Sequence, residues 1–404
     1  MKEEKKLVPK LRFPEFRGAG EWNTDALGKV ADFVNEKIPF ERVAVENYVS
    51  TENILSDFGG VARASKLPTT GSVTRYRPND TLVSNIRPYL KKVWVADKEG
   101  GASNDVIVIR AKQGLQPEYL SYLLKNDAFI GYVMTGAKGV KMPRGDVGSM
   151  KAYPTLYPAK AEQQKLADCL SSLDELIAAQ ARKVDALKTH KKGLMQQLFP
   201  REGETQPRLR FPEFRDTGEW LENTLGNLVE IRSGNSPSHY QLIQDGKFPF
   251  VKVEDLNNCE KHQRVARGYC NDPYGLVPSN SVIFPKRGAA IALNKVRLSK
   301  REILMDTNMM ALTPIDGYQA DFLFHYLSQI GLDRIADSST IPQINNKHII
   351  PLPVLVPLLE EQQCIADCLT SLDDLITAAT QELETLKTHK KGLMQQLFPL
   401  AEAA

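Results

Sequence analysis

The sequence of 404 residues has few of the features that point directly to a membrane or an oxidising compartment. No apolar run approaches the roughly 18 residues that a bilayer-spanning helix needs, and the first residues, MKEEKKLVPK, contain no hydrophobic signal region. There are only five cysteines, an odd number, and Cys169, Cys364 and Cys368 fall in predicted helices. We therefore expect reduced thiols and a cytoplasmic location.

Charge of one sign is also lacking, because the net charge is +3 and the isoelectric point about 8.4. Charged residues make up 25% of the chain and apolar residues 42%, as in an ordinary globular protein. This balance does not require a nucleic-acid partner, but it leaves room for a local basic face. The length favours two or three domains.

Motifs of the common enzyme classes are missing. There is no G-x-x-x-x-G-K-[ST] loop, no G-x-G-x-x-G after a strand, no H-E-x-x-H, no G-x-S-x-G and no paired C-x-x-C. Cys259, His262 and Cys270 lie close in sequence, but structural zinc needs four ligands and no fourth is evident. N-D-P-Y at 271–274 lacks the second proline of the N-P-P-Y motif of amino-methyltransferases. We expect a non-catalytic chain with no catalytic residue, metal or cofactor of its own.

Long internal repeats are what the sequence does have. LKTHKKGLMQQLFP at 187–200 returns unchanged at 386–399, and EQQKLADCLSSLDELI at 162–177 returns as EQQCIADCLTSLDDLI at 361–376. PKLRFPEFRGAGEW at 9–22 likewise matches PRLRFPEFRDTGEW at 207–220. The segments between these repeats differ, so the chain is two copies of one unit, each with a variable part followed by a shared part.

The shared parts are predicted to be helices of about 39 residues, roughly 58 Å long. Pro158 and Pro357 precede them and Pro200 and Pro399 follow them, as helix boundaries require. Apolar residues recur at a spacing of four and three, interrupted at Gln180, Lys191 and Lys390. The predicted seam comprises Leu166, Leu170, Leu173, Ile177, Leu187 and Leu194 in the first helix and Ile365, Leu369, Leu372, Ile376, Leu386 and Leu393 in the second.

A single such helix would leave its apolar stripe in water, so each helix needs a partner. We predict that the two pair as an intramolecular antiparallel coiled coil, which would relate the two variable domains by a pseudo-two-fold axis. The alternative is two independent surface helices, each packed on its own domain.

The variable parts contain short strand-like runs followed by helix-like runs, which predicts an α/β or α+β fold. The strand-like runs are 80–86, 92–96 and 105–110 in the first copy and 280–285 and 302–312 in the second, and the helix-like runs are 117–134 and 320–335. We expect globular domains at 1–158 and 207–357, helices at 159–199 and 358–399, a polar linker at 200–206 and a tail at 400–404. Divergent loops on a shared scaffold suggest recognition of two different targets.

Basic and polar loops occur at matching places in both copies, at 84–94 and 285–297 and again at 136–146 and 338–348, and Arg87 matches Arg287 at an offset of 200. Arginine and lysine suit phosphates and guanine edges, while asparagine and glutamine can pair with adenine. The alternative is that they are ordinary solvated loop residues. The candidates for DNA contact are Asn85, Arg87, Tyr89, Lys91, Lys92, Lys138, Lys141, Arg144, Lys286, Arg287, Asn294, Lys295, Arg297, Gln343, Asn345, Asn346 and Lys347.

The LRFPEFR openings, the E-Q-Q segments that follow a proline and the KKGLMQQLFP endings are the specific elements of a resemblance that covers nearly the whole chain. In this combination the chain resembles the specificity subunit (HsdS) of Type I restriction-modification enzymes. The resemblance implies two target-recognition domains that each read half of a split, asymmetric DNA sequence, and helices that fix the gap and dock two modification subunits. S-adenosylmethionine for adenine methylation, and ATP and Mg for two motor-nuclease subunits, are then expected on the partners.

Two other functions remain possible from the sequence. A methyltransferase with its own recognition domain would need a cofactor motif, which is not evident. A scaffold that recognises other proteins through its variable domains would use the helices as a spacer.

Overall fold

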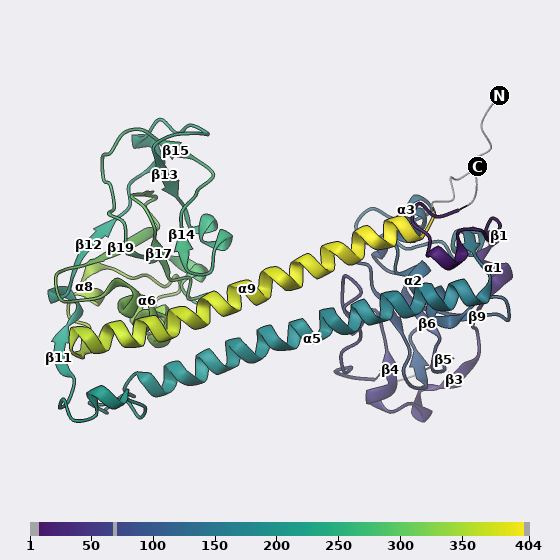
Figure 1. Cartoon of the computed structure of the whole chain (residues 1–404), viewed down its shortest axis with the longest axis horizontal. Helices are drawn as coiled ribbons and strands as arrows, with labels where there is room; N and C mark the ends of the chain where they lie inside the picture. The colour runs from purple at the N-terminus through teal and green to yellow at the C-terminus, as the bar shows by residue number, and fades with distance from the viewer. Residues whose placement is uncertain (1–7, 68–70, 400–404) are drawn as a thin grey trace. The chain divides into compact units, whose positions relative to one another are not determined.

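The computed structural model describes residues 8–67 and 71–399, and they divide into two compact units (Figure 1). Of the described residues, unit 1 comprises 8–67, 71–179 and 383–399, and unit 2 comprises Gln180–Glu382. The long helices are α5 (Lys160–Leu198) and α9 (Leu359–Leu397), each of 39 residues. Each unit therefore contains one variable domain, the beginning of the helix that follows it and the end of the other helix.

Unit 1 is built on two four-stranded sheets and one two-stranded sheet, with order β2-β9-β6-β7, β3-β5-β8-β4 and β1-β10. Among the strands that the structure describes in this unit, the pairs are antiparallel except β4 with β8. The strands are β1 (Asn23–Ala26), β2 (Ala31–Phe33), β3 (Lys37–Pro39), β4 (Tyr48–Val49), β5 (Ser72–Tyr76), β6 (Thr81–Ser84), β7 (Val93–Val95), β8 (Gly100–Ala102), β9 (Val106–Ala111) and β10 (Pro154–Tyr157).

The helices of unit 1 correct one prediction, because the run at 117–134 forms two helices rather than one. The side chain of Asn126 accepts a hydrogen bond from Ala128 N (3.0 Å) and caps the second of them. The short helices are α1 (Leu27–Val30), α2 (Pro117–Leu124), α3 (Asp127–Thr135) and α4 (Val147–Ala152).

Unit 2 contains a five-stranded sheet of order β12-β19-β16-β17-β14, a three-stranded sheet β15-β13-β18 and the pair β11-β20. The strand-like run at 302–312 divides into two strands in different sheets. The strands are β11 (Leu221–Thr224), β12 (Val229–Ser233), β13 (Phe248–Val251), β14 (His262–Gln263), β15 (Tyr269–Cys270), β16 (Val282–Pro285), β17 (Arg297–Ser299), β18 (Leu304–Met305), β19 (Met309–Pro314) and β20 (Pro353–Val356).

The predicted helix at 320–335 is also divided, into α6 (Ala320–Ile330) and α7 (Leu332–Ile335), and α8 (Asn346–Ile349) follows. The break falls at Gly331, whose φ of +90° lies in a region that glycine enters without steric cost. Both variable domains are thus mixed α/β, as the strand-like and helix-like runs predict.

All the predicted seam residues are buried or half-buried, but part of the seam serves a different purpose from the predicted one. Leu166 and Leu170 of α5 lie in the apolar core of unit 1, where they share a cluster with Leu397 at the end of α9. In unit 2, Ile365 and Leu369 share a core cluster with Leu198. The helix ends therefore belong to the domain cores as well as to a helix pair.

The polar residues that interrupt the seam make contacts between α5 and α9 within each unit. In unit 1, Lys390 Nζ lies 2.5 Å from Asp174 Oδ1, and in unit 2 the equivalent pair, Lys191 and Asp373, also lies at 2.5 Å. Gln180 donates to Ala379 O (2.9 Å) and to the Glu382 carboxylate (2.8 Å). In unit 2, Gln180 of α5 thus contacts Ala379 and Glu382 of α9, whereas the later Lys191 contacts the earlier Asp373. These two segments therefore run antiparallel.

A residue of each variable domain also faces one of these aspartates. Tyr122 of α2 donates its hydroxyl to Asp174 Oδ2 (2.9 Å), and burial together with Asp174 raises the pKa of Tyr122. The matching residue of α6, His325, is fully buried with Nε2 3.9 Å from Asp373 Oδ2, and burial lowers its pKa well below the usual range. Both variable domains therefore place a side chain of the same helix position next to the aspartate of the long helix, a tyrosine hydroxyl in unit 1 and an imidazole in unit 2.

A bidentate ion pair joins the opening segment of each copy to the start of its long helix. Arg12 donates from Nε and Nη2 to the two carboxylate oxygens of Glu162 at 2.7 Å each, and Arg210 donates in the same way to Glu361, again at 2.7 Å. Both pairs are largely removed from solvent, and the carboxylate raises the pKa of each arginine. These contacts account for the repetition of LRFPEFR together with the glutamate of E-Q-Q.

The first glutamine of each E-Q-Q segment completes this joint. Gln163 is fully buried, accepts from Gln116 N (2.8 Å) and donates to the carbonyls of Gly114 (3.1 Å) and Pro158 (2.8 Å). Gln362 makes the equivalent bonds, to Gln319 N (2.9 Å), Gly317 O (3.2 Å) and Pro357 O (3.1 Å). A buried amide needs all such partners, so the motif is structural.

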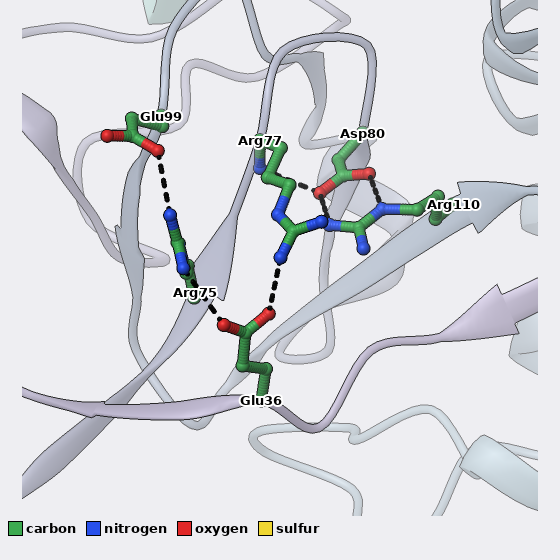
Figure 2. Close-up of polar contacts among 6 residues, drawn as sticks. All are labelled: Glu36, Arg75, Arg77, Asp80, Glu99 and Arg110. Carbon is green, nitrogen blue, oxygen red and sulfur yellow. Dashed lines mark hydrogen bonds and ion pairs between the residues drawn. The ribbon is translucent and has the colours of Figure 1, made fainter.

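Several arginines of unit 1 are held in a network with carboxylates that links β5 to β9 (Figure 2). The buried Asp80 accepts two hydrogen bonds of 2.7 Å from Arg110 and one of 2.8 Å from Arg77 N. Glu36 accepts from Arg75 (3.1 Å) and Arg77 (3.2 Å), and Arg75 also reaches Glu99 (3.1 Å). The charges largely compensate one another, so the guanidinium groups of these arginines are already paired within the protein.

In the part of the chain that the structure describes, none of the helices contains an apolar stretch of the length that a bilayer-spanning segment requires. The five cysteines form no disulfide in this structure.

Removing one partner of the Arg210–Glu361 pair tests how strongly the joint holds. We expect Glu361→Ala to lower the free energy of unfolding of unit 2 by about 3–5 kcal/mol, because Arg210 is left buried without a counter-charge. The measurement is hydrogen exchange of the first turns of α9 in the full-length chain. The neighbouring, exposed Glu360 supplies the control, since Glu360→Ala should change stability by less than about 0.5 kcal/mol. Equal protection in the two variants would contradict the structural role of the pair.

Candidate nucleic-acid interface

The two loop clusters predicted in each copy lie side by side in the structure. We call residues 85–92 and 286–297 the basic loops, and residues 138–144 and 337–343 the proline loops. In unit 1, Arg87 N donates to Pro143 O (2.8 Å) and Gly145 N donates to Asn85 O (3.0 Å). In unit 2 the matching bonds run from Gly288 N to Pro342 O (2.9 Å) and from Ile344 N to Lys286 O (3.0 Å). The same two backbone bonds therefore join the loops in both units.

Each proline loop is also closed on itself. In unit 1, the backbones of Lys138 and Arg144 exchange two hydrogen bonds of 2.9 Å, and Gly139 between them has a φ of +94°. In unit 2, Asp337 N donates to Gln343 O (3.0 Å), and the Asp337 carboxylate accepts from Gln343 N (3.0 Å). Hydrogen bonds from Ser339 and Gln343 lower the pKa of Asp337, so this carboxylate stays ionised and holds the loop closed.

The structure corrects the sequence match of Arg87 with Arg287. In the shared bonding pattern, Arg287 lies opposite Gln343 as Ile86 lies opposite Arg144. Arg287 is therefore equivalent to Ile86, one residue away from the predicted match. Its backbone is extended, with φ of −144°, whereas Arg87 is left-handed, with φ of +51°, at the start of the 3-10 helix η4 (Pro88–Leu90).

Two polar atoms at the loop junction of unit 1 are buried. Within the described residues, Asn85 Oδ1 and Arg87 Nε have no hydrogen-bond partner. Leaving such an atom unpaired costs about 1–3 kcal/mol, so each requires an explanation. Both atoms lie where the basic loop meets the proline loop of unit 1.

Some of the predicted DNA-contact residues present exposed side chains on these loops or, in unit 2, at residues 345–347 directly after the proline loop. In unit 1 the Arg144 guanidinium also lies 3.1 Å from Asp105, and in unit 2 the exposed Asn345 caps α8. Gln343 is half-buried. The exposed candidates are Tyr89, Lys138, Lys141 and Arg144 in unit 1 and Arg287, Asn345, Asn346 and Lys347 in unit 2. Their contact with DNA remains a prediction.

Other candidates already use their polar atoms inside the protein. In unit 1, Lys91 pairs with Asp127 (2.7 Å) and Lys92 donates to Thr51 O (2.6 Å). In unit 2, Asn294 bonds to the backbones of Ser328 and Leu332, and Lys295 donates to the side chain of Asn257. Arg297 donates to the carbonyls of Leu256, Cys259 and Val296. These side chains therefore position the loops. The sequence could not reveal this role, because each partner except the Val296 carbonyl lies at least 34 residues away.

Lys286 is an intermediate case. It is half-buried and donates to the neutral hydroxyl of Ser233 (2.9 Å). Burial first, and then the neighbouring Arg287, lower the pKa of Lys286, while Asp306 acts in the opposite direction. An anion close to this lysine would stabilise its charged form, so the pair Lys286 and Arg287 suits a phosphate.

Sequence reasoning missed a polar cavity of about 410 Å³ beside the basic loop of unit 1. Two residues of its lining, Thr51 and Asp105, are bonded to the basic loop. Lys92 donates to Thr51 O, and Asn85 N donates to Asp105 O (2.8 Å). Its lining includes Tyr48, Asn53, Arg63, Lys66 and Ser103. The basic pair in VARASKL at 61–67 was the available signal.

Metal chemistry gains no support in the part of the chain that the structure describes, where no group of three or more His, Cys, Asp or Glu side chains could hold an ion. Cys259 instead donates to the side chain of Gln263 (3.1 Å). What the paired loops offer is a set of cations, amides and backbone groups suited to binding.

The anchor of the unit 2 proline loop can be tested with one substitution made at two positions. Ile344 is fully buried in the core next to the loop, so Ile344→Ala should cost about 2–5 kcal/mol and expose the backbone bonds of residues 286–288 and 342–344 to hydrogen exchange. Ile341 is 62% exposed, so Ile341→Ala should leave both stability and exchange unchanged. Faster exchange in neither variant would show that Ile344 does not anchor the loop.

Comparison with known proteins adds independent information. The family model described as "Type I restriction modification DNA specificity domain" matches residues 20–189 and again 217–388. The MjaVIII specificity subunit of a type I restriction enzyme from Methanocaldococcus jannaschii is 24% identical over 412 residues, covering 96% of this chain and 93% of that protein.

Two solved structures share the fold. The S subunit of the type I restriction-modification system of M. genitalium aligns with a TM-score of 0.61 and 18% identity, over 98% of this chain and all of that one. A chain from a study of complex assembly and conformational transition of the type I restriction-modification system aligns with a TM-score of 0.60 and 20% identity, over 93% and 97%. Since the family model matches most of the sequence in two copies, the chain belongs to the family of type I restriction-modification DNA specificity subunits.

Proposed function

We propose that this chain selects a two-part, asymmetric DNA target, with each unit reading one part, and directs adenine methylation and restriction by partner subunits. One observation carries the proposal. The same backbone bonds join a basic loop to a proline loop in both units, while the exposed side chains differ. A common frame with different contacting groups is what recognition of two different half-sites requires.

The side chains suggest what each unit prefers. The loops of unit 1 present Lys138, Lys141 and Arg144, which suit phosphates and guanine edges. In unit 2, the half-buried Gln343 of the proline loop and the exposed Asn346 at the start of α8 suit adenine edges, and the cations Arg287 and Lys347 are exposed as well.

The shared helices supply a reason for two identical partners. Leu176 and Leu375 are apolar, 57% and 55% exposed, and occupy the same position in α5 and α9. Repeated surfaces of this kind suit two copies of one modification subunit, which we expect to carry S-adenosylmethionine. ATP and Mg belong, in this proposal, to two restriction subunits, and the helices act as a spacer between half-sites.

A scaffold that binds proteins is the competing function. The cationic loops favour DNA, because charged residues are depleted at the centre of protein interfaces. Binding to duplex DNA should weaken steeply with salt, whereas a protein interface should respond less.

The decisive experiment is adenine-methylation mapping in cells that express this chain with its modification partner. We expect one bipartite motif, methylated on both strands, that is absent when this chain is omitted. Methylation that does not depend on this chain, or that follows no fixed motif, would contradict the proposal.

Charge reversal at exposed loop positions tests the interface itself. We expect Lys141→Glu and Arg287→Glu each to weaken binding of the assembled complex to its mapped target by about 10- to 100-fold and to reduce the salt dependence, since a contact worth roughly 1–3 kcal/mol is lost.

Matched controls are exposed cations outside the loops, Lys29→Glu in unit 1 and Arg208→Glu in unit 2. Their affinities should stay close to that of the unaltered chain. An equal loss in controls and loop variants would mean that net charge, rather than these loops, governs binding.

A further inference from the structure

Both proline loops carry an exposed apolar side chain at the same position. Met142 is 52% exposed and Ile341 is 62% exposed, and each directly precedes the proline of its loop. The two residues are 199 positions apart, the spacing of the shared helices, although the loop sequences around them have diverged. A feature kept between loops that otherwise differ calls for a shared purpose.

Neither side chain serves the fold at its present position. Met142 and Ile341 belong to none of the apolar core clusters, whereas Ile344, three residues beyond Ile341, fills the core of unit 2. Single exposed apolar residues are common on protein surfaces, so exposure alone decides nothing. Here the position is repeated and the loop is built to hold it.

The loops hold these tips rigidly. In unit 1 the tip lies within the ring closed by Lys138 and Arg144, and the residue after it, Pro143, accepts from Arg87 N. In unit 2 the ring is closed by Asp337 and Gln343, and the Ser339 hydroxyl, which carries a single proton, lies 2.6 Å from Asp337 Oδ1 and 2.7 Å from Ile341 O. Because the backbone is already ordered, a contact made by the tip loses little conformational entropy.

We propose that Met142 and Ile341 are apolar wedges that press into the base stack of the DNA, one in each half-site. The inference rests on the proposed function, since it names how the same loops engage DNA. Side chains such as methionine, isoleucine and proline are used for this purpose, and unstacking a base step costs free energy. Burial of the tip against the bases and the phosphate contacts of its neighbours offset that cost.

The surroundings of the tips favour DNA over a protein partner. Met142 has Lys141 beside it and Arg144 two residues later, and Ile341 follows Ser338, Ser339 and Thr340. An isolated apolar group surrounded by cations and hydroxyls matches a groove bordered by phosphates. The core of a protein interface would instead need a wider apolar patch with few charges.

The test uses the complex with its modification partner and target duplexes in which 2-aminopurine, whose fluorescence rises on unstacking, replaces one base at a time. Positions of the methylated adenines are left unlabelled. With the unaltered chain we expect one bright step in each half-site. Met142→Ala should remove the bright step in one half-site only and Ile341→Ala in the other only, and each should weaken binding about tenfold with an unchanged salt slope.

Two variants serve as controls. Val140→Ala removes a fully exposed apolar residue of the same loop that has a serine at the matching position of unit 2, and Leu221→Ala removes one that is 74% exposed on β11. Both should retain the bright steps and the affinity. An equal loss in Val140→Ala would overturn the assignment to Met142.

The outcomes separate this inference from the proposed function. If the unaltered complex methylates a fixed motif but the bright steps persist in Met142→Ala and Ile341→Ala, the wedges are refuted and the proposed function stands. Loss of co-purifying modification subunit from these variants, with unchanged fluorescence for each bound complex, would show that the tips contact protein and would also refute the wedges.

Discussion

The joint between each variable domain and its long helix is the constraint on which the rest of the structure depends. A buried arginine–glutamate pair and a fully bonded glutamine amide fix the first turn of α5 and of α9. The chain reaches that turn through the proline loop, a short helix and a strand, namely α4 and β10 in unit 1 and α8 and β20 in unit 2. A shift of the helix start would therefore displace the loops that we propose as the DNA-reading surface.

Contacts between the long helices explain why the two copies of the sequence remain identical in some places and not in others. Asp174 with Lys390 in unit 1, and Asp373 with Lys191 in unit 2, place one charged contact at the equivalent point of the helix pair in each unit. Polar contacts within an apolar seam fix the register of paired helices at a cost in stability. Only one register brings all these groups together, which constrains their identity, while the outer faces of the loops are free to vary.

Sequence was sufficient for the parts of the fold that rest on repetition and periodicity. The internal repeat predicted two copies of one unit, and the apolar spacing between prolines predicted helices of the observed length. The breaks at Asn126 and Gly331 were missed, because a capping side chain and a single left-handed residue interrupt an apolar pattern that otherwise continues. The candidate site was predicted as two separate loops, and their contact depends on backbone bonds that leave no trace in residue identity.

Individual side chains could not be assigned for a similar reason. Arg297 and Asn294 look like surface residues in sequence, yet their donors are used by carbonyls brought near by the fold. Arg287 and Arg87 align by letter, but the loops shift one against the other by a residue. Such facts depend on tertiary partners, whereas a residue such as Gln163 reveals its importance by recurring in a fixed motif.

The central claim is that the repeated segments hold the molecule together and that the paired loops meet the DNA. Hydrogen exchange of the complete complex, with and without its target duplex, tests this claim most directly. The account predicts that DNA slows exchange in residues 85–92 and 138–144 of unit 1 and in 286–288 and 337–347 of unit 2. Exchange should stay unchanged in the short segments around the two ion pairs, that is, near Arg12 and Glu162 and near Arg210 and Glu361. Protection confined to the repeated segments, with none in the loops, would contradict it.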